Sequence, residues 1–447
     1  MIALVAVFAA LHAPASSPRA LTLREATDIA LSSDPGVQKA RIDEERARLA
    51  TVVANFERVH ASVDASVEEL YAGGSSTFFS SEKLGWQSGV LGLSNVQASV
   101  DVPIFSGFRV DSDIARAEDL EKASGFDLEA ARQATALAVA RAYWSERRLA
   151  LLQEAQLSSA ARLEDSERVV TARVNAGLAA GIDKNRAAAR RAELDVEKRS
   201  LEAQRREADV RMQVALGMDE PVTLTDGLPT DLATVAVTAP DALVQIALDK
   251  KPELKAAELR GDAVDEEKRA AQSAFWPQLG AGALAQVGNN PAIAGAGTRA
   301  VVPSAIPFVG TGADLQAGLT LSVNLFDSYT TTHNIDDAAH RRRLADAQLR
   351  ALRRDVESNV RLAHAKLASL VDQRKALDDA RAIEADNTVI LQKAYERGEV
   401  LLTELLDAQV RLADAERQIV DVDAQLALAR IELSYATDGA LSAEVSR

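Results

Sequence analysis

The chain is an internal duplication, and this feature limits its possible folds more than any other. Phe105 aligns with Phe326 at an offset of 221 residues, and the same offset holds without a gap over about 90 positions. The matched pairs include Val139 with Val360, Gly177 with Gly398, and Arg190 with Arg411. Nearer the N-terminus, Pro35 aligns with Pro252. Repetition at this length indicates two copies of one unit, neither of which closes a structure alone.

Each half has the same order of predicted elements. A helix of about 36 residues comes first, over 24–59 and again over 241–275. Two strands, a helical pattern of about 70 residues, a glycine-bearing turn and a final helix of about 36 residues follow. The first repeat is predicted over 21–217, with strands at about 61–72 and 93–105, a long helix over 107–176 and a turn over 177–181. The second is predicted over 241–438, with strands at about 278–287 and 315–326, a long helix over 328–397 and a turn over 398–402. A linker over 218–240 joins the halves, and 439–447 forms a short tail.

The final helix of the second repeat carries a heptad seam. Its apolar residues follow one another at spacings of three and four: Leu405, Ala408, Leu412, Ala415, Ile419, Val422, Leu426, Ala429, Leu433 and Ala436. The equivalent helix of the first repeat is interrupted by Arg191, Lys198 and Arg205. Aromatic residues make up only 4% of the chain while 47% is apolar, a composition that favours closely packed helices over a core of large side chains.

The strand segments alternate between apolar and polar residues. In one of them Val96, Ala98 and Val100 alternate with Gln97 and Ser99. Each segment runs for about ten residues, the length with which a tilted strand crosses a bilayer. A soluble hairpin would need another layer packed on it. Four strands cannot close a membrane barrel, so several copies of the chain would share one: two copies would supply eight strands and three would supply twelve. The stretches 73–92 and 288–312 are then the cell-surface loops.

The N-terminus has the pattern of a secretory signal peptide. An unbroken apolar run from Ile2 to Leu11 precedes Ala13-Pro14-Ala15, a cleavage site of the A-x-A type, so residues 1–15 are the predicted signal. The run is too short to span a bilayer as a helix. A basic region before it is missing, which leaves an ordinary buried segment as the alternative.

Charge and composition exclude several functions. Lys and Arg number 51 against 66 Asp and Glu, and a formal net charge of −15 argues against binding to nucleic acid. The chain has no cysteine, which excludes disulfides, thiolate metal sites and a lipid anchor on cysteine. His333, Asp337 and His340 share one helical face, but the first repeat has no such set, and a solvated face is the expected reading. We therefore expect no metal, no cofactor and no enzymatic activity.

This sequence of elements resembles that of the TolC-like outer-membrane efflux proteins, which are the outer membrane factors of tripartite efflux and type I secretion systems. The resemblance rests on the duplicated order of elements, on the strand ends at 103–107 and 324–327, and on the two turns at 173–183 and 395–408. It implies a mainly helical fold with membrane β-structure: a duplicated coiled-coil α-barrel of long helices plus four transmembrane strands per chain. It also implies a homotrimer whose twelve-stranded barrel lies in the outer membrane and continues as a periplasmic tunnel, with 218–240 at the tunnel's equator.

The resemblance further implies a function as a passive exit duct. The partners would be outer-membrane lipid, a periplasmic adaptor protein and an inner-membrane pump of the RND, ABC or MFS type. Two alternatives remain from the residues alone: a periplasmic adaptor subunit, which would need a compact β-rich domain, and a structural coiled-coil protein without a pore, which would not need strands of membrane length.

The resemblance places the two turns at the periplasmic aperture. Acidic residues of the aperture match Glu404 and Asp407, and a closing network matches Asp183 and Tyr395. Where some members carry an arginine in that network, this chain has Val400. The predicted adaptor-docking residues at the turns are Gly177, Leu178, Gly181, Gly398, Leu401 and Leu402. Without the resemblance, the acids would be ordinary first-turn residues, the glycines ordinary helix ends, and the leucines equally suited to a buried wall.

Overall fold

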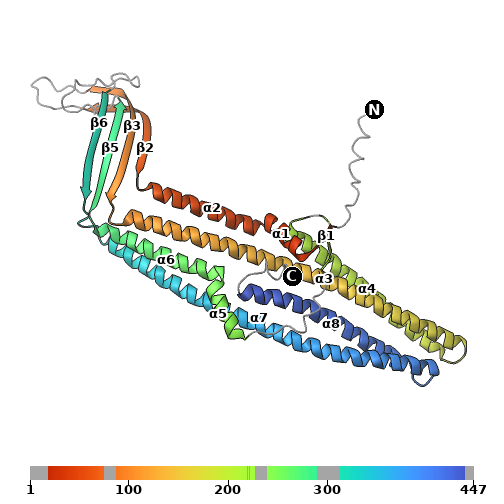
Figure 1. Cartoon of the computed structure of the whole chain (residues 1–447). Coiled ribbons are helices and arrows are strands. Elements are labelled where there is room, and N and C mark those ends of the chain that lie inside the picture. Colours follow the sequence, from red (N-terminus) through yellow and green to blue (C-terminus); the bar gives the residue numbers. More distant parts are fainter. Residues whose placement is uncertain are drawn as a thin grey trace, which may run out of the picture. The chain divides into compact units, whose positions relative to one another are not determined.

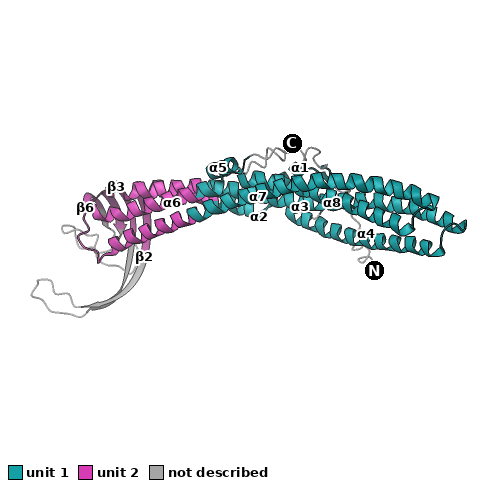
Figure 2. Ribbon diagram, turned by 90° about the horizontal axis from the view of Figure 1, so that it is seen from below, with its two compact units in different colours: residues 1–43, 125–256, 349–447 teal, residues 44–124, 257–348 magenta. Residues whose placement is uncertain are grey.

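The computed structural model describes residues 19–74, 87–218, 220, 222–226, 239–288 and 312–437. The predicted signal segment 1–15, the tail 439–447 and most of the two predicted surface loops lie outside the described residues. The chain divides into two compact units (Figure 2). Unit 1 consists of three segments: the chain up to Asp43, Gly125–Ala256, and the chain from Leu349 onward. Unit 2 consists of Glu44–Ser124 and Ala257–Gln348.

Unit 2 contains a four-stranded antiparallel sheet built from both repeats (Figure 1). Strands β2 (His60–Gly74) and β3 (Gln87–Phe105) come from the first repeat, and β5 (Gln278–Gly288) and β6 (Gly312–Ser322) from the second. The order across the sheet is β2-β3-β5-β6, so pairing of β3 with β5 joins the two hairpins. Within the described residues β2 and β6 pair on one side only and form the edges of the sheet.

The register aligns apolar residues into rows across all four strands. One row is Val63, Ala98, Ala285 and Leu315, and the next is Ala61, Val100, Ala283 and Ala317. The other face carries rows of mainly polar residues, among them Asp64, Gln97 and Gln286. The apolar rows are not buried, because Val63 is 76% exposed and Leu315 is 78% exposed. The sheet therefore presents an exposed apolar face and a largely polar face, on which Gln97, Ser99 and Gln286 are half-buried.

The strand-to-helix junction has the same backbone in both repeats. Gly107 and Phe108 have φ of +64° and +71°, and the equivalent Ser328 and Tyr329 have +54° and +67°. A Cβ atom at Gly107 would lie 2.7 Å from the carbonyl oxygen of Ser273, so space requires glycine there, whereas the equivalent Ser328 adopts the same conformation with a side chain. The duplication has thus preserved a tight left-handed turn that starts each long helix.

The opening helices differ from the sequence expectation, because each is two helices. The first repeat has α1 (Leu23–Ser33) and α2 (Pro35–Phe56), and the second has α5 (Pro240–Lys250) and α6 (Pro252–Gln272). The prediction of unbroken helices over 24–59 and 241–275 was wrong for a local reason. Asp34 and Lys251 precede prolines and have ψ of 124° and 121°, since a following proline ring disfavours the helical conformation. Asp34 Oδ1 then accepts a hydrogen bond from the backbone N–H of Val37 at 2.9 Å, which caps α2.

The remaining helices form two hairpins whose turns lie in unit 1. The first hairpin is α3 (Arg109–Asn175) with α4 (Gly181–Leu216), and the second is α7 (Thr330–Arg397) with α8 (Leu402–Thr437) (Figure 1). The heptad seam of α8 is buried at eight of its ten positions, and Ile419 and Leu433 are half-buried. None of the described helices is long and apolar enough to cross a membrane.

The segment that joins the repeats contains a strand that the sequence patterns did not reveal. Strand β4 (Val222–Leu224) pairs in parallel with β1 (Arg19–Leu21) at the start of the described chain. Leu21 and Leu224 join the largest cluster of buried residues in unit 1, around Tyr143, which is fully buried. The Tyr143 hydroxyl accepts the N–H of Asp226 at 3.1 Å and donates to the Leu21 carbonyl at 3.4 Å. The predicted fold class, mainly helical with a small sheet from both repeats, is confirmed.

Candidate functional site

The two predicted turns have the same backbone and lie side by side in unit 1. Gly177 and Gly398 have φ of +73° and +80°. In the first turn the N–H of Leu178 donates to the carbonyl of Arg173 at 2.8 Å, and in the second the N–H of Glu399 donates to the carbonyl of Ala394 at 3.0 Å. Each is a Schellman motif, in which a left-handed glycine lets the chain satisfy the last carbonyls of a helix.

A hydrophobic cluster joins the ends of the two hairpins. It is formed by Leu163 and Val170 of α3, Leu194 of α4, Tyr395 of α7, and Leu402, Leu405 and Leu406 of α8. Val400 lies half-buried against the same cluster. The cluster holds the four helix ends at the turns as one body.

The three leucines considered for docking have different environments. Leu178 is 68% exposed and Leu401 is 65% exposed, whereas Leu402 is buried. Leu402 is therefore part of the buried wall between the helices, which was the alternative to adaptor docking. It begins α8 on the side that faces the cluster. Gly177, Gly181 and Gly398 are exposed backbone beside the two exposed leucines.

The acidic residues at the start of α8 point away from the cluster. Glu404 and Asp407 are exposed, three positions apart on the same side of the helix, while their neighbours Leu405 and Leu406 are buried. Asp183, in the first turn of α4, forms an ion pair with Arg186 at 3.2 Å. The structure thus places Glu404 and Asp407 together, and Asp183 near Tyr395 on the other hairpin. Burial, and then the charge of Asp183, raise the pKa of Tyr395 above its ordinary value.

One functional candidate that the sequence reading missed is Arg173. Its guanidinium lies over the ring of Tyr395, with 5.1 Å from Cζ to the ring centroid. Nη1 donates to the carbonyl of Glu396 at 2.5 Å, and Nη2 donates to the carbonyl of Leu178 at 3.2 Å. A comparison of the two repeats could have revealed Arg173, because the equivalent residue in the second repeat is Ala394 and the two copies therefore differ at this position.

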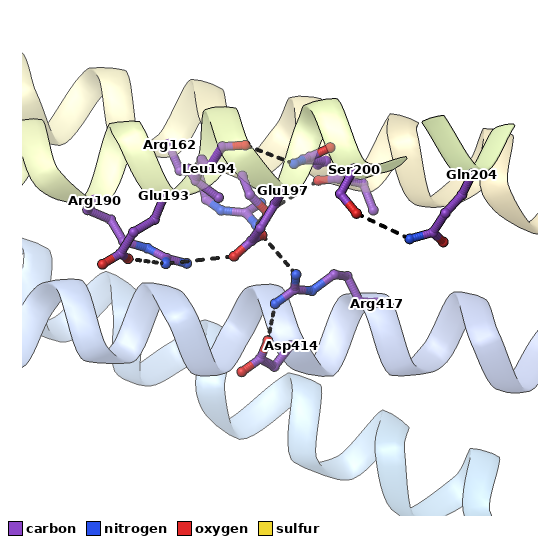
Figure 3. Close-up of polar contacts among 12 residues, drawn as sticks. Arg162, Arg190, Glu193, Leu194, Glu197, Ser200, Gln204, Asp414 and Arg417 are labelled. Carbon is purple, nitrogen blue, oxygen red and sulfur yellow. Dashed lines mark hydrogen bonds and ion pairs between the residues drawn. The ribbon is translucent and has the colours of Figure 1, made fainter. Parts of the chain in front are cut away.

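Ion pairs continue the connection between the hairpins away from the turns. Arg417 of α8 contacts Glu197 of α4 at 2.9 Å and also Asp414 (Figure 3). Arg190 lies 3.9 Å from the same Glu197. Arg162 of α3 reaches Glu416 of α8 at 2.5 Å. Burial opposes the charge of Arg417, but Asp414 and Glu197 outweigh it and raise the arginine's pKa.

The histidine set noted in the sequence does not form a metal centre in the structure. Asp337 is engaged by Arg341 at 2.6 Å, and His333 and His340 are exposed. Across the part of the chain that the structure describes, no group of three or more His, Cys, Asp or Glu side chains could hold a metal ion.

Residues 243–439 match the family model for the outer membrane efflux protein. No curated protein matches the sequence. Among solved structures, a membrane protein from Pseudomonas aeruginosa aligns with a TM-score of 0.75 and 21% identity, covering 93% of each chain. The outer membrane protein VceC from Vibrio cholerae aligns at 0.73 and 16%, covering 93% of this chain and 96% of VceC. CusC aligns at 0.76 and 15%, covering 93% and 92%.

At such identities these structures establish the shared fold, and the family match supplies the sequence relationship. The matched residues are the second repeat, and the first repeat is its internal copy. The second repeat therefore matches the outer membrane efflux protein family in sequence, and the chain shares the fold of these solved outer membrane proteins.

Proposed function

We propose that the protein is a passive exit duct of the outer membrane, formed by three copies of the chain. It binds no fuel itself, and it conducts substrates that an inner-membrane pump delivers through a periplasmic adaptor. The observation that carries this proposal is the sheet of unit 2, with an uncovered apolar face and two edges. An apolar face of aligned strands suits lipid, and the polar face opposite suits a water-filled lumen.

The width of the sheet supports the trimer. Four strands are too few for a membrane barrel, the smallest of which have eight. If β2 of one copy pairs with β6 of the next, three copies close a barrel of twelve strands and leave no edge exposed to lipid. The strands would lie in the outer membrane and the helices in the periplasm.

Exposed aromatic side chains mark where this membrane region ends. Five of them lie at the junctions between strands and helices in unit 2: Phe56, Phe108, Trp276, Phe326 and Tyr329. Aromatic rings gather at membrane–water interfaces because they have both apolar and polar parts. We assign these junctions to the periplasmic surface of the outer membrane.

A stripe on α4 supports the assembly in the helical part. Ile182, Ala189, Val196, Ala203 and Val210 recur every seven residues, and all are exposed within the single chain. A heptad repeat of this kind is a packing surface for another helix. A neighbouring copy would cover the stripe in the trimer.

The turns supply the aperture and the docking surface. Glu404 and Asp407 would each form a ring of three carboxylates around a narrow pore, which attracts cations and repels anions. Asp183 and Tyr395 would lie between the hairpins behind this ring. Leu178 and Leu401, with the exposed backbone at Gly177, Gly181 and Gly398, would meet the adaptor of an RND, ABC or MFS pump.

The experiment is reconstitution of the purified protein into planar bilayers. The wild type should form cation-selective channels of low conductance. The double variant Glu404→Ala, Asp407→Ala should pass anions more readily and lose block by multivalent cations, because the carboxylates are gone. Glu207→Ala is the matched control, since Glu207 is an exposed acid of α4 paired with Arg211. A wild type without any channel activity would contradict the proposed function, and an unchanged double variant would remove these two acids from the pore.

A further inference from the structure

The two turns share a backbone but not their side chains. Four and three residues before the turn glycine, the first repeat has Arg173 and Val174. The second repeat has Ala394 and Tyr395 at the same two positions. The large polar side chains therefore sit at different positions in the two copies. This difference lets the arginine of one hairpin lie on the tyrosine of the other.

Arg173 binds both hairpins at once. Its bond to the Leu178 carbonyl fixes it to its own turn, and its bond to the Glu396 carbonyl fixes it to the end of α7. Glu396 is the penultimate residue of α7, where the carbonyls lack partners within the helix and the helix dipole is negative. A cation at this place gains from both effects.

Arg173 lies over the ring of Tyr395 and also acts on its hydroxyl, since burial and then Asp183 raise the pKa of this group while Arg173 opposes them. Tyr395 is only 3% exposed, and its hydroxyl has no hydrogen-bond partner among the described residues. Asp183, which the resemblance places in the same closing network, forms an ion pair with Arg186. Val400 supplies no charge and packs into the hydrophobic cluster.

We propose that Arg173 is the cation that keeps the aperture closed in this chain, in the place of the arginine that is absent at Val400. The proposal rests on the proposed function as a channel and names how that channel is held shut. Within each copy, Arg173 clamps the α3–α4 hairpin to the α7–α8 hairpin. If the second hairpin moves away from the first, two hydrogen bonds and a cation–π contact must break or rearrange.

The geometry requires arginine and not merely a positive charge. The guanidinium lies over the ring while two separate nitrogens reach two carbonyls, whereas a lysine ammonium has only one nitrogen for all three contacts. A side chain at Gly398 would lie 2.9 Å from Nη2 of Arg173, so the glycine also leaves room for the clamp.

The test compares four variants of the full-length protein with the wild type. Arg173→Ala removes the clamp, Arg173→Lys keeps the charge, and Tyr395→Phe keeps the ring without the hydroxyl. Arg397→Ala is the matched control, because Arg397 immediately precedes Gly398, is exposed, and pairs with Glu399 of the same turn at 2.7 Å. It removes the same charge from the same region without separating the hairpins.

Two measurements are made on each variant. In planar bilayers, Arg173→Ala should raise the ratio of open to closed channels about tenfold, because hydrogen bonds from a charged group are lost. Arg173→Lys should fall between Arg173→Ala and the wild type, and Tyr395→Phe and Arg397→Ala should match the wild type. In hydrogen exchange, Arg173→Ala should speed exchange at the amides of Gly398 and Glu399, and Arg397→Ala should not.

Specific outcomes overturn the proposal. If Tyr395→Phe opens the channel as far as Arg173→Ala, the hydroxyl and Asp183 form the lock instead. If Arg397→Ala has the same effect as Arg173→Ala, only the general charge of the region matters. If Arg173→Ala changes neither conductance nor exchange, there is no clamp. Exchange is measured without conduction, so it tests the clamp even if the wild type forms no channel and the proposed function fails.

Discussion

Helices α4 and α8 are copies of one another with opposite surroundings. Both have 36 residues and both follow a glycine turn, yet α4 buries five residues and α8 buries fifteen. Equivalent positions show how this arises, because Val210 on α4 corresponds to Ile431 on α8, and Val210 is 57% exposed while Ile431 is 6% exposed. One copy is packed inside its own chain, and the other presents its apolar stripe outward.

The difference teaches how a duplicated chain divides its tasks. If both helices were buried within the chain, the unit would be complete and would have no reason to assemble. If both were exposed, the chain would have too little core to fold. Because α8 supplies the internal seam, α4 is available to meet a neighbouring copy. The comparison can be tested at matched positions of the two helices.

The largest expected effect is on the internal seam. Ile431→Ala should lower the free energy of unfolding by about 3 kcal/mol, because it empties a packed site. Val210→Ala, at the equivalent place on α4, should cost less, because that side chain is more than half exposed in its own chain and loses only contacts with a neighbouring copy. Thermal unfolding in detergent, followed by circular dichroism, measures both. Equal losses would mean that the two helices are packed alike.

The next effect is on assembly. Val196→Asp combined with Val210→Asp should weaken the trimer about 10- to 100-fold, because carboxylates would have to be buried in an apolar seam. The helical content of each chain should remain unchanged. Native mass spectrometry in detergent gives the fraction of trimer. Lys198→Asp, on α4 beside the stripe, serves as the control. If this variant loses as much trimer as the double variant, then any added acid on α4 weakens the assembly and the stripe has no special role.

A third effect depends on pH and concerns Glu432 of α8. Burial opposes its charge, but Lys366 at 2.8 Å and Arg141 at 3.0 Å outweigh burial and lower its pKa. A lowered pKa in the folded state means that the stabilisation is present at neutral pH and is lost as the pH falls through the folded-state pKa, below the ordinary value of 4.5.

Glu432→Gln should therefore lower the free energy of unfolding by about 1 kcal/mol at pH 7, and by much less at a pH below the folded-state pKa of Glu432. Unfolding measured across this pH range checks the sign. The equivalent residue on α4 is Arg211, which pairs with Glu207 in the open, and Arg211→Gln should change stability little at any pH. A cost of Glu432→Gln that stays constant down to acid pH would exclude the charge as its cause.

The smallest effect joins the two helices directly. Arg417 and Glu197 are each about one third exposed, so their coupling in a double-mutant cycle should be about 0.2–1 kcal/mol. The cycle uses Arg417→Met, Glu197→Gln and the double variant, again by thermal unfolding. High salt should reduce the coupling, and a coupling that salt does not alter would point to packing rather than charge.

The sequence was sufficient for the parts of the fold that follow a period. The heptads of α8, the long helices and the alternation of β3 and β5 depend on spacing alone, and spacing is visible in one sequence. The breaks at Asp34 and Lys251 were also visible, as residues before prolines, but the apolar pattern on both sides suggested one continuous helix. Strand β4 was not predictable from period, because three residues are too few to show one.

The candidate site divides in the same way. The turns followed from the positions of Gly177 and Gly398, whereas Glu404 and Asp407 were singled out by the resemblance of the second turn to the family. Burial of Leu402 against exposure of Leu401 depends on which side of α8 meets the hydrophobic cluster, and a single helix does not carry that information. Arg173 was overlooked because its partners are mainly backbone carbonyls, which every residue has.

The parallel pairing of β1 with β4 constrains the order in which the chain can fold. The backbone N–H of Leu23 donates to the carboxylate of Asp226 at 2.7 Å, and the two residues are 203 positions apart. Strand β1 therefore has no strand partner until the whole first repeat has been made. Closing a loop of this length is slow relative to forming the local helices. Strand β1 must wait for its pairing partner, so this link between the two ends of the first repeat forms only when the repeat is complete.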